Sequence, residues 1–143
     1  MKETFNILLV EDDDIDTENV IRAFKKNKMS NPIYTVENGE EALAFLKNQG
    51  RFADHEKSPR PGIILLDINM PIMNGIEFLR IVKADDDLKS IPVVVLTTSR
   101  EESDRVESFK LSVAGYIVKP VEFEDFVYAV KTIDVYWTLS EHD

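Results

Sequence analysis

Short apolar runs alternate along the chain with longer stretches of mixed polarity. Runs of four to eight mostly apolar residues are typical of strands buried on both faces of a parallel sheet. We predict such strands at Phe5–Val10, Ile63–Leu66, Val93–Leu96 and Gly115–Val118. A fifth run, Ile33–Val36, is shorter and more mixed, as an edge strand tends to be.

Between these runs, apolar residues recur with a helical period. We predict one helix from about Asp14, a second after an N-cap at Asn38, and a third over Gly75–Ala84. A weaker helix is expected over Glu101–Leu111, anchored by Val106 and Phe109, and a last one over about 122–139. Strands alternating with about five helices predict a doubly wound α/β sandwich of three layers.

The 143 residues contain no internal repeat and no linker, which predicts a single domain over 1–143. The polar segment 48–62, with its glycines and prolines, is longer than most connections in α/β proteins. It is therefore expected to be either mobile or used for contacts.

The last predicted helix has two apolar stripes. One stripe is sufficient to dock a helix on a sheet, so the second requires another explanation. A homodimer interface is our preferred interpretation, although the tail could cover this stripe or the residues could simply be exposed. The second stripe consists of Tyr128, Val135, Tyr136 and Leu139.

Composition excludes several classes of function. The net charge of -10 opposes binding to nucleic acid or to an anionic membrane. The absence of cysteine excludes disulfides and thiolate metal sites, and two distant histidines make a histidine-based metal site or triad improbable. With no signal peptide and no apolar run of bilayer length, the expected location is the cytoplasm.

Polar residues follow four of the predicted strands. These are the acidic run Glu11–Asp14, Asp67, Thr97 and Lys119. Alone, Asp67 is more often a turn former or a helix cap. In a parallel sheet, however, the carboxyl ends of the strands lie along one edge, where ligands bind. These groups are therefore expected to gather around Asp67.

Several carboxylates at one edge suit a hard divalent cation such as Mg²⁺. Glu11 and Asp12, nearest the strand end, are the better candidate ligands, whereas Asp13 or Asp14 is expected to cap the following helix. With Mg²⁺ present, Asp67 could act as a nucleophile towards a phosphoryl group. Lys119 could pair with Asp67 and then with phosphoryl oxygens, and Thr97 could donate its hydroxyl to them.

Four ordered motifs resemble the response-regulator receiver domain of two-component signalling. They are Leu9-Val10-Glu11-Asp12, Leu66-Asp67-Ile68-Asn69-Met70-Pro71, Leu96-Thr97-Thr98 and Tyr116-Ile117-Val118-Lys119-Pro120. This resemblance spans nearly the whole chain, and it implies the flavodoxin-like strand order 2-1-3-4-5.

The resemblance also implies roles for single residues. Asp67 would accept the phosphoryl group of a histidine kinase's phosphohistidine. Glu11, Asp12, Asp67 and the backbone carbonyl of Asn69 would hold Mg²⁺, or Mn²⁺ in its place. Thr97 and Tyr116 would be the switch pair, and the Lys119–Pro120 bond would be cis, which is a minority state.

Several other features are similar to a narrower group, the stand-alone receivers that accompany bacterial phytochrome-type kinases. They are the segment 48–62, the run Ile91–Ser99 and the ending Tyr136-Trp137. This similarity implies a kinase of that type as the partner. With no DNA-binding or catalytic output domain in the sequence, the signal would leave through protein contacts or through competition for phosphoryl groups.

Three alternatives compete with this interpretation. A phosphatase of the haloacid-dehalogenase class needs a second Asp two residues after its nucleophile, where this chain has Asn69. A flavodoxin-like electron carrier needs a phosphate site, which the acidic first loop opposes. A receiver-fold adaptor that is never phosphorylated stays open.

Overall fold

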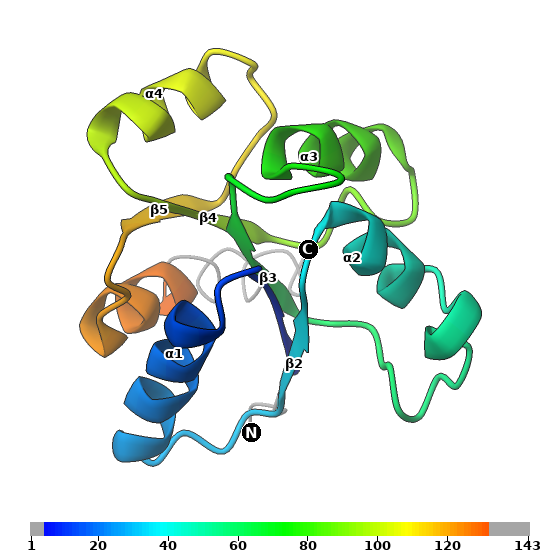
Figure 1. The fold of residues 1–143 in the computed structure, drawn as a ribbon, viewed down its shortest axis with the longest axis horizontal. Helices are drawn as coiled ribbons and strands as arrows, with labels where there is room; N and C mark the ends of the chain where they lie inside the picture. The colour runs from blue at the N-terminus through cyan, green and yellow to red at the C-terminus, as the bar shows by residue number, and fades with distance from the viewer. Residues whose placement is uncertain (1–4, 132–143) are drawn as a thin grey trace, which may run out of the picture.

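The computed structural model describes residues 5–131, which form a five-stranded parallel sheet with helices on both faces (Figure 1). The strand order is β2-β1-β3-β4-β5, which confirms the prediction. The first strand begins two residues later than predicted, and Asp67 and Thr97 are themselves the last residues of their strands. The strands are β1 (Ile7–Val10), β2 (Ile33–Val36), β3 (Ile63–Asp67), β4 (Val93–Thr97) and β5 (Gly115–Val118).

Four complete helices lie within the described residues, and residues 123–131 are helical as well. The helices are α1 (Asp14–Lys26), α2 (Gly39–Leu46), α3 (Gly75–Ala84) and α4 (Arg100–Glu107), with one 3-10 turn, η1 (Gly50–Phe52).

Helix α4 ends four residues earlier than predicted. Lys110 and Ser112 adopt positive φ angles of 52° and 55°, which a continuing helix cannot contain. Phe109 therefore lies beyond the helix and is 37% exposed, with the guanidinium of Arg80 4.5 Å from the centre of its ring. The expectation that Phe109 anchors the helix was wrong, whereas Val106 is fully buried as expected.

The two faces of the sheet carry separate hydrophobic clusters. Side chains of successive strand residues point to opposite faces, so each strand contributes to both clusters. Val20 and Phe24 of α1 and Phe126 of the last helical segment pack on one face. Helices α2, α3 and α4 cover the other face (Figure 1), where Phe45 and Phe78 are the largest buried side chains of these helices.

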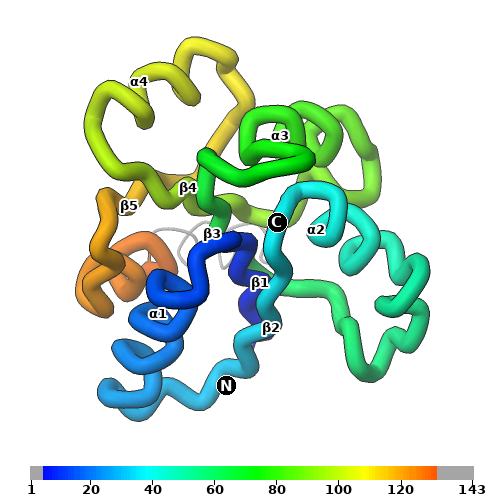
Figure 2. Tube along the Cα trace, viewed as in Figure 1, coloured from blue at the N-terminus to red at the C-terminus, as the bar shows by residue number. Residues whose placement is uncertain are grey.

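The segment 48–62 is an ordered connection beyond α2 (Figure 2). The amide of Asn48 donates hydrogen bonds to the carbonyls of Phe52 and Ser58, at 3.0 and 2.9 Å. Arg60 donates to the carbonyl of Asp87 at 2.7 Å, which fixes the end of the segment to the connection before β4. The contacts described for this segment lie within the chain, and both expectations for it, mobility or use for contacts, stay predictions.

Each helix that follows a strand end begins with a polar cap. Asp13 accepts hydrogen bonds from the backbone of the first turn of α1, and Asn38, Asn74 and Ser99 do the same for α2, α3 and α4. Asp13, Asn38 and Ser99 follow the ends of their strands within three residues, so these turns at the carboxyl edge of the sheet are short, whereas the connection from β3 to α3 spans residues 68–74.

Only one residue of the predicted interface stripe belongs to the described part of the chain. Tyr128 is 74% exposed, and Val135, Tyr136 and Leu139 lie outside residues 5–131. The predicted end of the last helix near 139 also lies outside them. Among the helices of residues 5–131, none has the length and apolar character needed to span a bilayer.

Candidate functional site

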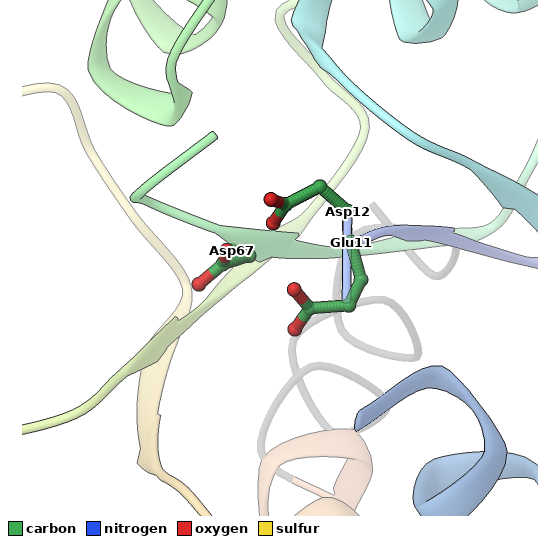
Figure 3. Close-up of side chains that lie close together, drawn as sticks. All are labelled: Glu11, Asp12 and Asp67. Atoms are coloured by element: carbon green, nitrogen blue, oxygen red, sulfur yellow. The ribbon is translucent and has the colours of Figure 1, made fainter. Parts of the chain in front are cut away.

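Three carboxylates meet at the carboxyl edge of the sheet (Figure 3). Glu11 and Asp12 follow β1 directly, and Asp67 ends the neighbouring strand β3, with which β1 pairs in parallel. One oxygen from each carboxylate lies within 4.8 Å of the other two. Glu11 and Asp67 are buried, whereas Asp12 is exposed. The expected gathering of acids around Asp67 is therefore present.

Lys119 brings the positive charge to this cluster. Its Nζ lies 2.6 Å from Oε1 of Glu11 and 3.0 Å from Oδ1 of Asp67, and the lysine side chain is only 15% exposed. The Lys119–Pro120 peptide bond is cis, as the family resemblance implies. The expected pairing of Lys119 with Asp67 is thus observed.

Sequence reasoning missed a third partner of this lysine. Oδ2 of Asp16, in the first turn of α1, accepts a hydrogen bond from Nζ of Lys119 at 3.1 Å. Asp16 is separated from Lys119 by 103 residues, and its side chain is 39% exposed. The only signal for Asp16 in the sequence was its position about one helical turn after Glu11 and Asp12, the acids that follow β1.

Crowding of acids in a buried place shifts the pKa values of the cluster. Burial, with a smaller contribution from the Asp67 charge, raises the pKa of Glu11 to about 7 despite its bond to Lys119. Burial likewise raises the pKa of Asp67, although Lys119 opposes the shift. Burial alone would lower the pKa of Lys119, but hydrogen bonds and charges from Glu11 and Asp67 raise it.

These residues fit a divalent cation. Carboxylates within a few ångströms of one another, with one lysine to offset their charge, form a set of hard oxygen donors. Burial disfavours the charged form of Glu11 and raises its pKa, and the charge of Asp67 adds a smaller contribution in the same direction. A cation held by Glu11, Asp12 and Asp67 would favour the charged carboxylates.

Thr97 ends β4, next to β3 in the sheet, where Leu96 pairs with Asp67. The side chain of Thr97 is completely buried, and its hydroxyl has no hydrogen-bond partner within residues 5–131. A buried hydroxyl without a partner is uncommon and costs free energy, which is often a sign of a functional role.

Tyr116 lies in β5 and pairs with Val95 rather than with Thr97. It is half-buried, against the hydrophobic cluster that α4 covers. Burial raises the pKa of its phenol, and the nearby carboxylates of Glu107 and Asp104 raise it further.

Asn69 is exposed, two residues beyond Asp67, and its side chain is held by a residue that sequence reasoning missed. Its Nδ2 donates to Oε2 of Glu102, in the first turn of α4, at 2.6 Å. The Ser99-x-x-Glu102 spacing is that of a capping box, which could have marked Glu102 as a side chain bent back towards the strand end.

The backbone of Gly75 packs closely against the backbone of Asp67. The N–H of Gly75, at the start of α3, donates to the carbonyl of Ile68 at 3.0 Å. A Cβ atom on Gly75 would lie 2.6 Å from the backbone oxygen of Asp67, so only glycine allows this close approach.

Comparisons with known proteins agree with this site. Residues 7–131 match the family model described as the response regulator receiver domain. The chain is 41% identical over 131 residues to the response regulator Rcp1 of Synechocystis sp., covering 92% of this chain and 87% of Rcp1. The Mn²⁺-bound structure of Rcp1 matches with a TM-score of 0.71, covering 93% of this chain and 94% of that one.

Two further solved structures are similar. The bacteriophytochrome response regulator AtBRR has a TM-score of 0.85 and 40% identity, covering 95% of this chain and 96% of AtBRR. The phosphorylated cyanobacterial phytochrome response regulator RcpA has a TM-score of 0.74 and 38% identity, covering 95% of each chain. With the four motifs, the strand order and the acidic cluster in agreement, the chain belongs to the family of response regulator receiver domains.

Proposed function

We propose that the chain accepts a phosphoryl group on Asp67 from the phosphohistidine of a histidine kinase. The observation that carries this proposal is the meeting of three acids and one lysine: the oxygens of Glu11, Asp12 and Asp67 lie within 4.8 Å, and Nζ of Lys119 is 3.0 Å from Asp67. Existing structures of phosphorylated RcpA and of Mn²⁺-bound Rcp1 support the proposal by similarity.

In the transfer, an oxygen of Asp67 forms a bond to phosphorus while the bond from phosphorus to the histidine nitrogen breaks. Phosphoryl transfer requires mainly positioning and neutralisation of charge. β1 and β4 pair with the two sides of β3, whose last residue is Asp67, and Lys119 stabilises the transferred oxygens. Glu11, Asp12, Asp67 and the carbonyl of Asn69 would hold Mg²⁺, with Mn²⁺ as an alternative, and this cation supplies further charge neutralisation.

Thr97 and Tyr116 are the proposed switch pair. The buried hydroxyl of Thr97 has no partner within residues 5–131, so it has a donor available for a phosphoryl oxygen. Movement of Thr97 would open space for the half-buried ring of Tyr116. The chain would also assist the later hydrolysis of its own aspartyl phosphate.

The test is incubation with Mg²⁺ and acetyl phosphate, followed by intact-mass measurement. One added phosphoryl group is expected, and Asp67→Asn should abolish it. Asp54→Asn is the matched control, because Asp54 is an exposed aspartate of segment 48–62 and should leave labelling unchanged. Labelling that persists in Asp67→Asn would place the acceptor elsewhere, and a failure to label the unchanged chain would favour an unphosphorylated adaptor.

The partner is proposed to be a histidine kinase of the phytochrome type, acting in the cytoplasm. Similarity to AtBRR and RcpA, both named as phytochrome response regulators, supports this choice. A survey of phosphotransfer rates from purified kinases tests it, since the partner kinase should transfer much faster than the others.

A homodimer through the last helix is a further proposal. It is supported by the second apolar stripe of Tyr128, Val135, Tyr136 and Leu139 and by the 74% exposure of Tyr128. Tyr136→Asp or Leu139→Asp should shift a dimer to a monomer on a sizing column. An unchanged elution volume for both variants would exclude this interface.

A further inference from the structure

Glu102 joins the two loops that flank Asp67. The β3–α3 loop comprises residues 68–74, and the β4–α4 loop comprises residues 98 and 99. Oε2 of Glu102 accepts from Nδ2 of Asn69 at 2.6 Å and from the hydroxyl of Thr98 at 3.3 Å. Its other oxygen, Oε1, accepts from the backbone N–H of Thr98 at 3.1 Å. One carboxylate therefore holds both loops.

The two residues that donate to Glu102 lie next to residues of the site. Asn69 is two residues beyond Asp67, and its carbonyl is a proposed ligand of the cation. Thr98 directly follows Thr97, whose buried hydroxyl has no partner within residues 5–131. A shift of the β4–α4 loop that carries the Thr97 hydroxyl to a phosphoryl oxygen would also move the backbone of the adjacent Thr98. Glu102 opposes that movement, because the Thr98 N–H is bonded to it.

We propose that Glu102 acts as a latch: its hydrogen bonds to Thr98 and Asn69 stabilise the unphosphorylated arrangement of these two loops. These bonds are released when Asp67 is phosphorylated. Glu102 is thus a positioning residue, which acts through Thr98 and Asn69. This inference rests on the proposed function, since the released state is the one with a phosphoryl group on Asp67.

A latch of this kind has a measurable consequence. Whatever stabilises the empty state weakens binding of any ligand that requires the other state. Hydrogen bonds to a charged acceptor are among the stronger ones, although solvent at this partly exposed site reduces their effect. Removing the Glu102 carboxylate should therefore tighten binding of a phosphoryl mimic by about three- to tenfold.

The experiment uses the full chain with saturating Mg²⁺ and beryllofluoride as the phosphoryl mimic, with affinity measured by calorimetry. Glu102→Ala should bind about three- to tenfold more tightly than the unchanged chain. Glu102→Gln removes the charge but keeps an oxygen that can accept from Thr98, so it should show a much smaller gain. Glu101→Ala, which removes an exposed charge from the same helical turn, should leave the affinity unchanged.

Amide hydrogen exchange without beryllofluoride gives a second readout. The Thr98 N–H should exchange faster in Glu102→Ala than in Glu101→Ala, because only the first variant removes its acceptor. Equal or weaker beryllofluoride binding by Glu102→Ala would overturn the latch. Equal tightening by Glu102→Gln would also overturn it, because repulsion by the charge would then explain the result. If the unchanged chain bound no beryllofluoride while exchange still responded, the proposed function would fail and the latch would have no state to regulate.

Discussion

Substitution of Lys119 by methionine tests the electrostatic description of the site. Methionine keeps most of the apolar length of the lysine and removes the ammonium. Glu11 and Asp67, whose side chains are 2% and 4% exposed, would then face each other without the cation that lies 2.6 and 3.0 Å away. Removal of one partner of a buried ion pair leaves an uncompensated charge in a poorly solvated place.

The expected cost is large. Breaking a buried pair from one side typically costs about 3–5 kcal/mol, compared with a total stability of about 5–15 kcal/mol for a small domain. Asp16 adds little, because its side chain is 39% exposed and pairs of that kind contribute about 1 kcal/mol at most. We therefore expect Lys119→Met to lose about 3–5 kcal/mol of unfolding free energy at about pH 8 without metal.

The loss should depend on pH with a definite sign. In the folded chain the pKa of Glu11 is already raised to about 7, and loss of Lys119 raises it and that of Asp67 further. Folded carboxyls with raised pKa values bind protons that the unfolded chain releases. The loss caused by Lys119→Met depends on the folded pKa values with and without the lysine, so for Glu11 it is small below about pH 7 and grows as pH rises through that value. The loss should be clearly smaller at about pH 6 than at about pH 8.

The assay is urea unfolding followed by circular dichroism, in metal-free buffer and then with Mg²⁺. Mg²⁺ should recover part of the lost stability by replacing the missing positive charge. Lys57→Met, in the exposed part of segment 48–62, is the control and should change stability by less than about 0.5 kcal/mol. A loss below about 1 kcal/mol for Lys119→Met, or a loss that does not change with pH, would refute the reasoning.

Three further predictions concern single features of the site. Thr97→Val should leave the free energy of unfolding in urea unchanged or raise it by up to about 1 kcal/mol, because the buried hydroxyl has no partner within residues 5–131. The variant should lose the response to phosphorylation, and a clear loss of stability would contradict this prediction. Ile72→Gly should stabilise the chain by about 0.5–1 kcal/mol, since Ile72 has a φ of 67° and is 75% exposed, whereas Ile81→Gly within α3 should destabilise it. Mg²⁺ should raise the free energy of unfolding by about 2.7 kcal/mol at a hundredfold excess over its Kd, and by less at about pH 6, where Glu11 has to release its proton to bind the cation. Asp12→Asn should weaken this stabilisation, and a urea midpoint that Mg²⁺ does not change would exclude the site.

Much of the fold could be predicted because its signals are local. Apolar runs such as Ile63–Leu66 can only be buried on both faces, and this requires a parallel sheet covered by helices. Once the strands are parallel, their carboxyl ends share an edge, which places Glu11, Asp67 and Lys119 along the same edge of the sheet. Lys119 follows β5, which β4 separates from β3, so its contacts with Asp67 and Glu11 also depend on the reach of its side chain.

The missed features depend on side-chain placement across distant segments. Asp16, in the first turn of α1, lies 3.1 Å from Nζ of Lys119 across 103 residues of sequence, and no pattern in the sequence encodes that distance. The same holds for Glu102 and Asn69, 33 residues apart. The end of α4 was misplaced because Phe109 continues the apolar period of the helix, whereas the backbone turns at Lys110.

The position of Asp67 at the end of the central strand separates two tasks. β3 is hydrogen-bonded on both sides, and Gly75 leaves no room beneath the backbone of Asp67, so the acceptor oxygens have a rigid floor. The surrounding rim consists of the loops that follow the strands, and it includes exposed side chains such as those of Asn69 and Thr98. Exposed residues of the rim can therefore be exchanged to alter timing or partner choice without displacing the acceptor. For an engineer, this is the part of the chain to vary, and the floor is the part to leave intact.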